Sequence, residues 1–218
     1  FDVVKVVDGD TIHVERDGVV EKLRLLSVDT EEKIGNRPST SVTKPDTVYG
    51  QETALWAKDF FAALAKGESL PQVGLLFPPD PLATRKDGSA SPSERRDVYG
   101  RLLCHVILPD GTDFNLLLVK TGRSPYFNKY GDSVEFDAEF RAAQREAREA
   151  QLGIWNPETN RPTTPDTPAV RRPYETLMPW WEARARAIGE FRTKHEADAT
   201  RFVDAGTPDQ LEAVTRSS

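Results

Sequence analysis

The chain has 218 residues, of which 38% are hydrophobic and 29% are charged, and its formal net charge is −6. This length allows one domain with an appendage or two small domains. The acidic balance argues against a protein that coats nucleic acid through bulk positive charge, although an enzyme can still meet phosphates at one local site. The single cysteine excludes an internal disulfide framework, and no apolar run is long enough to span a bilayer.

The first third of the sequence predicts an antiparallel meander of three strands. Residues 3–7 are rich in β-branched side chains, and residues 11–15 alternate between apolar and polar positions. Residues 19–28 return after the hairpin signal Asp17-Gly18. This arrangement would bring the acidic residues that follow the first and third strands to the same end of the sheet.

The middle of the sequence predicts a helix between irregular segments. Residues 33–48 lack apolar periodicity and predict a loop, either a solvated connector or a segment that closes over a substrate. Residues 51–66 have helical spacing of apolar side chains before a glycine stop, and residues 70–77 predict a strand. The polar segment up to residue 96 predicts a long exposed hairpin or loop.

The following part predicts one more strand at residues 101–108, a short helix at 114–121 and the clearest helix at 134–152. Trp155, directly after the last helix, is expected to fold back onto the core. The order of elements predicts an α+β protein, mainly β, with a five-stranded barrel of the OB type and about three packed helices.

A change in composition after residue 155 predicts the domain organisation. Residues 1–155 form the first domain, and residues 156–173, with five prolines and four threonines, form a linker. Residues 174–218 are expected to be a helical extension that contacts a protein partner or a further domain. A helix start at Thr207 lies so close to the end that the natural chain is expected to continue.

An acidic cluster carries the chemistry. Asp10 and Asp29 are a natural pair of ligands for a hard divalent cation, with the Thr30 carbonyl as a third oxygen. Glu32 is placed to act as a general base on a water molecule, and the fork of Arg24 matches a phosphate. These groups together predict phosphodiester hydrolysis, although Asp-Gly sequences are also typical of simple turns.

Several motifs in order resemble the staphylococcal nuclease-like family, the thermonucleases. They are VDGDT at residues 7–11, RLL at 24–26, VDTEE at 28–32, YG at 49–50, DVYGR at 97–101 and GIW at 153–155. The resemblance covers about residues 3–155. It implies an OB-fold enzyme that hydrolyses DNA and RNA with calcium and leaves 3′-phosphate ends.

The resemblance also implies roles for individual residues. Asp10 and Asp29 match the calcium carboxylates, Thr30 the carbonyl ligand and Glu32 the general base. It further matches Arg24 and Arg101 to the transition-state arginines, Asp8 to an acidic neighbour of the metal, and Tyr99 and Tyr126 to the nucleotide pocket. The missing initiator methionine predicts either a mature secreted form or a trimmed fragment, and the resemblance favours the secreted form.

Two further positions are less well defined. Lys129 lies three residues after Tyr126, where a phosphate contact beside a stacked base and a solvated loop are both compatible with the sequence. Glu31 stands where the family often has proline, and its carboxylate either binds the metal differently or faces solvent.

An alternative from another functional class is a catalytically weak or inactive scaffold that binds nucleic acid or protein together with the C-terminal extension. Such domains lose one or more of the metal carboxylates or arginines. This chain keeps all of them, so the sequence favours the nuclease, with DNA and/or RNA as its substrate.

Overall fold

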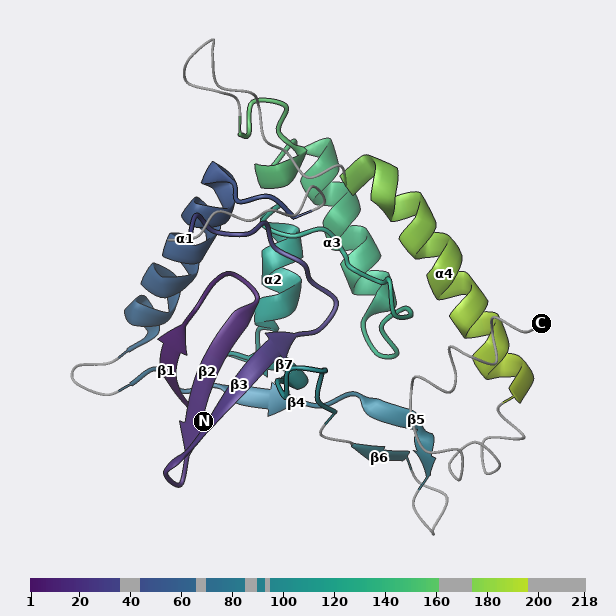
Figure 1. Cartoon of the computed structure of the whole chain (residues 1–218), viewed down its shortest axis with the longest axis horizontal. Helices are drawn as coiled ribbons and strands as arrows, with labels where there is room; N and C mark the ends of the chain where they lie inside the picture. Colours follow the sequence, from purple (N-terminus) through teal and green to yellow (C-terminus); the bar gives the residue numbers. More distant parts are fainter. Residues whose placement is uncertain (36–43, 66–69, 85–89, 93–94, 161–173, 196–218) are drawn as a thin grey trace.

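The protein combines a mixed β-sheet with four α-helices in the described ranges. The computed structural model describes residues 1–35, 44–65, 70–84, 90–92, 95–160 and 174–195, and for residues 79–84 and 90–92 it describes the backbone only. Figure 1 shows the sheet at one end of the molecule, with α1, α2 and α3 gathered at its other end. The predicted α+β class and the C-terminal helix are confirmed.

The main sheet has five strands in the order β1-β2-β3-β7-β4. They are β1 (Asp2–Val6), β2 (Thr11–Arg16), β3 (Val19–Leu25), β4 (Gly74–Leu76) and β7 (Leu102–Ile107). β1, β2 and β3 form the predicted antiparallel meander, and β7 joins β3 in parallel. Asp17 and Gly18 both have positive φ (53° and 77°), as the two-residue turn requires.

The predicted barrel is not closed, which corrects the expectation from the sequence. β4 is only three residues long and pairs with β7. The chain before β4 meets β1 only at an isolated bridge between Asp2 and Gln72, with a hydrogen bond from the Val3 N–H to the Pro71 carbonyl (2.8 Å). A strand this short cannot extend the ladder across the gap, so the five strands remain an open sheet.

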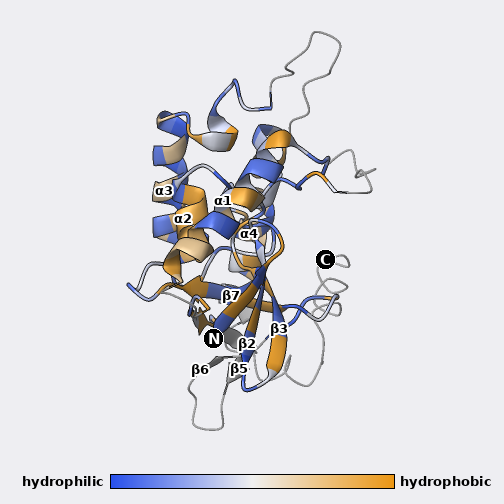
Figure 2. Ribbon diagram, turned by 90° about the vertical axis from the view of Figure 1, so that its left-hand side faces the viewer, coloured by the Kyte–Doolittle hydropathy of each residue, from blue (hydrophilic) through white to orange (hydrophobic). Residues whose placement is uncertain are grey.

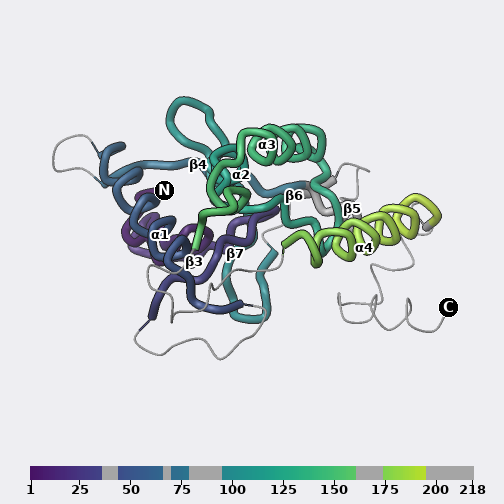
Figure 3. Tube along the Cα trace, turned by 90° about the horizontal axis from the view of Figure 1, so that it is seen from above, coloured from purple at the N-terminus to yellow at the C-terminus, as the bar shows by residue number. Residues whose placement is uncertain are grey.

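The helices are α1 (Val48–Leu64), α2 (Phe114–Lys120), α3 (Asp137–Glu149) and α4 (Tyr174–His195), with the 3₁₀ turn η1 (Gly153–Trp155) after α3. Figures 1 and 3 place α1 and α4 on opposite sides of α2 and α3. No helix in the described ranges is long and apolar enough to cross a membrane.

Local capping explains where the helix boundaries differ from the prediction. α1 begins three residues early because the Thr47 hydroxyl accepts a hydrogen bond from the Gly50 N–H (2.8 Å) and caps the first turn. α3 begins late because Phe136, at its N-cap, has non-helical backbone angles (φ −126°, ψ 19°). Apolar periodicity alone marks the buried face of a helix and does not mark its first residue.

The core lies between the sheet and the helices. Four aromatic rings meet there: Trp56, Phe60 and Phe61 from α1, and Phe114 from α2, with Phe61 and Phe114 4.8 Å apart. Figure 2 shows a largely hydrophobic α2 beside a largely hydrophilic α3. Trp155 is 9% exposed, so its predicted burial is confirmed, but it packs with α4 in a second cluster and not in the main core.

The predicted hairpin after β4 is present as an antiparallel pair, β5 (Pro79–Thr84) and β6 (Ala90–Pro92). Most of the predicted loop at residues 33–48, most of the predicted linker and the helix start at Thr207 lie outside the described residues. The domain boundary at residue 155 therefore stays a prediction.

The substitution Phe114→Ala tests the aromatic core. Phe114 is fully buried against three aromatic rings, so its removal leaves a cavity and should lower the free energy of unfolding by about 3–5 kcal/mol. Chemical denaturation measures the change. Leu55→Ala on the exposed face of α1 is the control, because Leu55 is 48% exposed, and equal losses in both variants would contradict the assigned core.

Candidate functional site

A tight turn before β2 carries the first two acidic residues. The Asp8 N–H donates to the Thr11 carbonyl (3.3 Å), and the Asp10 N–H donates to the Asp8 carboxylate (3.2 Å). Gly9 is required at the tip because a Cβ atom there would lie 2.7 Å from the Thr30 methyl group. The turn therefore packs directly onto the segment that carries the other acidic residues.

Asp10 is a buried carboxylate with several partners. Its Oδ1 accepts a hydrogen bond from the Thr11 hydroxyl (3.2 Å), and its Oδ2 accepts one from the Thr30 N–H (2.9 Å). Oδ2 also forms an ion pair with Nη1 of Arg24. The pairing of Thr11 with Arg24 in the ladder between β2 and β3 brings this arginine beside the aspartate.

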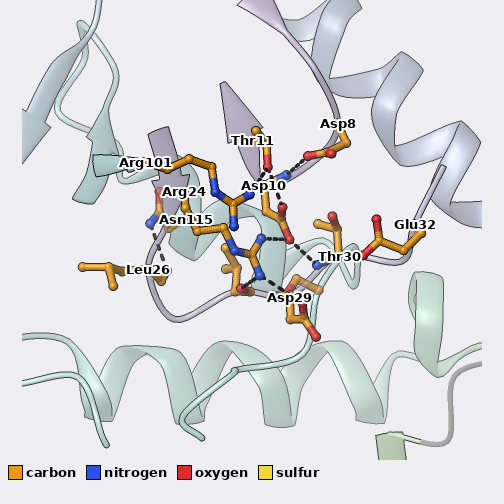
Figure 4. A network of polar contacts seen from close by, with 12 residues as sticks. Asp8, Asp10, Thr11, Arg24, Leu26, Asp29, Thr30, Glu32, Arg101 and Asn115 are labelled. Carbon is orange, nitrogen blue, oxygen red and sulfur yellow. Dashed lines mark hydrogen bonds and ion pairs between the residues drawn. The ribbon is translucent and has the colours of Figure 1, made fainter. Parts of the chain in front are cut away.

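Arg24 connects the two predicted metal carboxylates. Its Nη2 lies 2.9 Å from Oδ1 of Asp29 and donates to the Val28 carbonyl (3.3 Å). Asp29 is 2% exposed, and its backbone N–H donates to the Ser124 hydroxyl (2.8 Å). Figure 4 shows the guanidinium lying between Asp10 and Asp29. Two carboxylates thus converge on one small volume.

The pKa values in this cluster follow from burial and charge. Burial alone would raise the pKa of Asp10, but the Arg24 guanidinium outweighs it and holds that pKa below its ordinary value. Burial and the negative charge of Asp10 raise the pKa of Asp8 to about 7. Burial opposes the charge on Arg24, yet Asp10 and Asp29 raise its pKa, so the ion pair persists at neutral pH.

Glu32 is accessible beside these ion pairs. Its side chain is 40% exposed, and its Oε1 lies 3.6 Å from Nζ of Lys44, which also contacts Oδ1 of Asp29 (2.7 Å). Figure 4 shows Glu32 to one side of Arg24 and its two carboxylate partners. The Glu32 carbonyl accepts a hydrogen bond from the Thr47 N–H (3.0 Å), which fixes the backbone from which this carboxylate extends.

Glu31 points away from this group. It is 2% exposed, and its Oε2 accepts hydrogen bonds from the Thr47 hydroxyl (2.6 Å) and the Asn160 amide (2.7 Å). Asn160 in turn accepts one from the Tyr49 N–H (2.8 Å). Glu31 therefore neither faces solvent nor lines the cavity described below. It ties its segment to the start of α1 and to the chain after η1.

Gly50 allows α1 to approach that segment closely. A Cβ atom at this position would lie 2.1 Å from the Glu32 carbonyl oxygen and 2.8 Å from that of Glu31. No side chain fits in this space, so the first turn of α1 rests directly on the backbone of both glutamates.

Arg101 approaches from the start of β7. Its Nε and Nη2 each lie 2.7 Å from Oδ2 of Asp97, and its Nη1 donates to the Thr11 hydroxyl (3.4 Å). The guanidinium carbon lies 5.5 Å from the centre of the Tyr99 ring. Asp97 also accepts hydrogen bonds from the Tyr99 and Arg101 N–H groups (both 2.9 Å), so the loop before β7 is ordered around one carboxylate.

These side chains share a cavity of about 990 Å³. Eight of the ten predicted site residues line it: Asp8, Asp10, Arg24, Asp29, Glu32, Tyr99, Arg101 and Lys129. Thr30 does not line it and is 3% exposed. The arrangement offers two buried carboxylates, one accessible carboxylate and two arginines to a single ligand, which suits an anion bound beside a cation.

Tyr126 lies in the core and does not line the cavity. It is 2% exposed and stacks on Phe140 with ring centres 5.0 Å apart. Its hydroxyl donates to Asp137 (2.8 Å) and accepts a hydrogen bond from the Ser133 N–H (2.7 Å), and burial raises its pKa. Its aromatic ring is therefore inaccessible to a nucleotide in this structure.

Comparison with known proteins identifies the family. The model of the family described as staphylococcal nuclease homologue matches residues 81–157. The chain is 32% identical over 158 residues to a thermonuclease of Staphylococcus intermedius, covering 70% of this chain and 74% of that protein. The chain belongs to the staphylococcal nuclease family. A nucleic-acid substrate follows from membership of this nuclease family.

Other relatives of this staphylococcal nuclease family member differ in length. An uncharacterized protein of Methanocaldococcus jannaschii is 35% identical over 165 residues, covering 71% of this chain and 70% of that protein. Endonuclease YhcR of Bacillus subtilis is 32% identical over 198 residues. That match covers 90% of this chain but only 13% of the endonuclease.

The family is typically calcium-dependent, and the donor set can be compared with that property. Across the described residues, no group of three or more His, Cys, Asp and Glu side chains is close enough to hold a metal ion. Asp10 and Asp29 nevertheless both contact Arg24, and Asp29 also contacts Lys44. The carboxylate oxygens of Asp10 and Asp29 are the kind of ligand that a hard cation prefers. They already bind positively charged side chains, so the donor set fits such a cation.

The cavity is also lined by residues that the sequence did not predict as site residues, among them Lys44, Asp97, Tyr130 and Trp180. Asp97 carried a signal, since it stands four residues before Arg101 in a turn motif. Lys44 lay in a loop without periodicity. Trp180 follows no site motif in the sequence, and it is 49% exposed whereas the adjacent Trp181 is 4% exposed.

The substitution Asn160→Ala tests the contact with Glu31. It removes a donor from a buried carboxylate, so the free energy of unfolding should fall by about 1–3 kcal/mol. Thermal or chemical denaturation checks this. Asn156→Ala is the matched control because its side-chain Oδ1 accepts a hydrogen bond from the Glu158 N–H at the exposed surface (2.9 Å). Equal stability of the Asn160 variant and the parent protein would contradict the proposed tie.

Proposed function

We propose that this staphylococcal nuclease family member is a calcium-dependent nuclease that hydrolyses phosphodiester bonds of DNA and/or RNA and leaves 3′-phosphate ends. The observation that carries the proposal is the convergence of Arg24, Arg101 and Glu32 on one cavity beside Asp10 and Asp29. The endonuclease and thermonuclease activities of its relatives support the same reaction.

Calcium would be held by the carboxylates of Asp10 and Asp29 and by the Thr30 carbonyl. When bound, it would supply positive charge that stabilises the charge developing on the phosphate. Asp8 supports the site indirectly, because its carboxylate accepts the Asp10 N–H and fixes the turn (3.2 Å). Burial and then the negative charge of Asp10 raise the pKa of Asp8 to about 7, and a bound cation would offset the second of these effects.

The chain's own residues would perform the reaction in a defined order. Arg24 and Arg101 bind the non-bridging oxygens of the phosphate, because a guanidinium fork matches two of them. Glu32 takes a proton from a water molecule, and the oxygen of that water bonds to phosphorus. The bond from phosphorus to the 5′ oxygen breaks, and this oxygen leaves with a proton from solvent. Tyr99 and Lys129 contact the nucleotide beside the phosphate.

A scaffold without activity is the less favoured function. It requires the loss of a residue that the chemistry needs, and the candidate site retains both arginines, both buried carboxylates and the accessible glutamate. Glu32 is also 40% exposed beside the ion pairs, as a base that meets water must be. A scaffold would bind nucleic acid with and without calcium and would release no product.

The substitution Glu32→Gln tests the base. It keeps the size of the side chain and removes its basic oxygen, so hydrolysis of single-stranded DNA with calcium should slow by about 10²–10⁴-fold. A chelator should abolish the activity of the parent protein, and calcium should restore it. Rates are followed by release of acid-soluble product, with end-group analysis of the 3′ phosphate.

Glu146→Gln on the exposed face of α3 is the matched control and should keep the parent rate. Circular dichroism would show that both variants are folded. A Glu32→Gln variant as active as the Glu146 control would remove Glu32 from the mechanism.

The substitution Lys44→Ala tests the cation site by a measurement other than activity. Lys44 and calcium would compete for Oδ1 of Asp29, which lies 2.7 Å from the Lys44 ammonium. Removing this like charge should tighten calcium binding by about two- to fivefold, as measured by titration calorimetry. Lys58→Ala on α1 is the charge-matched control. Unchanged or weaker calcium binding in the Lys44 variant would show that calcium binds elsewhere.

A further inference from the structure

We propose that α4 forms a second binding subsite, in which Trp180 stacks a base of single-stranded nucleic acid while Lys129 and Arg192 meet the neighbouring phosphates. The inference rests on the proposed function, since it extends the same substrate past the candidate cleavage site. The candidate cleavage site and α4 share one cavity. This cavity of about 990 Å³, lined by Arg24 and Glu32, is also lined by Leu177, Trp180 and Arg192 of α4.

α4 is held against the nuclease domain by a buried cluster. Tyr174, Met178 and Trp181 are 3%, 6% and 4% exposed and pack with Trp155. The Trp181 ring meets the Phe127 ring edge to face with centres 4.8 Å apart. The beginning of the helix is therefore a fixed wall of the cavity.

A second contact holds the other end of the helix. A Cβ atom on Gly131 would lie 3.3 Å from Nη1 of Arg192 and 3.4 Å from the Ile188 side chain. The Arg192 guanidinium thus lies directly over the loop that carries Lys129 and Tyr130. Both ends of α4 are consequently positioned relative to this loop.

The two adjacent tryptophans of α4 have different environments. Successive residues on a helix point about 100° apart, so Trp181 is buried in the cluster while Trp180 stays 49% exposed, and both line the cavity. Nζ of Lys129 lies 5.2 Å from the Trp180 ring centre and 5.4 Å from that of Tyr130. The Arg184 guanidinium carbon lies 6.0 Å from the Trp180 ring centre. A half-exposed indole beside these two cations offers a base a surface for stacking and its phosphate a positive charge.

The charge of this end of the cavity fits a polyanion although the whole chain is acidic. At the part of the cavity next to Trp180, the lining residues Lys129 and Arg192 carry positive charge. The nearby Asp132 carboxylate binds the Asn128 amide (2.9 Å) and Arg141 (2.9 Å), which also pairs with Asp137 (2.9 Å). These contacts offset part of the negative charge of Asp132, so it repels a phosphate near Lys129 less than an unpaired carboxylate would.

Base stacking on Trp180 selects the form of the nucleic acid. A base can stack on an indole only after it leaves its own stack, which costs little in a single strand and considerably more in a duplex. The subsite should thus favour single-stranded substrates of several nucleotides. Because stacking uses the face that every base has, we expect little sequence preference at this position.

Binding of a fluorescently labelled 12-nucleotide oligothymidylate, measured by anisotropy in chelator, tests the subsite directly. Trp180→Ala should weaken binding by about 5- to 100-fold, and Trp180→Phe should recover most of the loss because it keeps an aromatic face. Binding of a 12-base-pair duplex should change by less than twofold. Leu55→Ala, which removes a similarly exposed apolar side chain outside the cavity, should bind like the parent protein.

The contribution of the Arg192 charge is tested in the same assay. Arg192→Ala should weaken single-strand binding and reduce its dependence on salt concentration, whereas Arg186→Ala, on an exposed position of α4 outside the cavity, should have no effect. Unchanged binding by both Trp180→Ala and Arg192→Ala would overturn the proposal, as would equal losses for single strand and duplex.

Hydrolysis distinguishes failure of the subsite from failure of the proposed function. With calcium, Trp180→Ala should raise KM for the oligonucleotide and leave cleavage of a dinucleotide at the parent rate. A parent protein that binds single strands through Trp180 but hydrolyses nothing would contradict the nuclease and support the subsite. Hydrolysis that is insensitive to Trp180 on both substrates would support the nuclease and refute the subsite.

Discussion

The buried ion pairs that Arg24 makes with Asp10 and Asp29 are the constraint on which the rest of the structure depends. Two carboxylates that are 6% and 2% exposed cannot stay charged without compensation, because an unpaired buried charge costs several kcal/mol. The pairing of β2 with β3 supplies the guanidinium, and the Thr30 N–H supplies a further donor to Asp10. The Thr30 N–H can reach Asp10 only because the turn at Gly9 packs closely against Thr30.

A second layer of contacts separates two adjacent glutamates into different roles. Glu31 is buried and held by Thr47 and Asn160, whereas Glu32 extends into the cavity from a backbone on which α1 rests. The close contact at Gly50 sets the distance between helix and segment. The carboxylate of Glu32 thus stays accessible beside Lys44, and the buried neighbour Glu31 anchors the backbone of this segment.

The C-terminal helix changes the shape of the site. A cluster around Trp181 attaches α4 to the domain, and the exposed Trp180 then borders the cavity that Arg101 and Glu32 share. The overall net charge of −6 does not describe this region, where arginine and lysine side chains gather beside the buried carboxylates. Local placement of charge, and not its total, decides which ligands such a cavity can attract.

The sequence by itself determined the three-stranded meander, the main helices, the burial of Trp155 and the family, because turn chemistry and apolar periodicity are local. Most of the site residues that it named also line the cavity. Only the tertiary structure decided that Tyr126 is in the core, that Glu31 binds Asn160 and that the sheet stays open. It likewise brought Trp180 to the cavity. These outcomes depend on contacts between segments far apart in the chain, which no local pattern encodes.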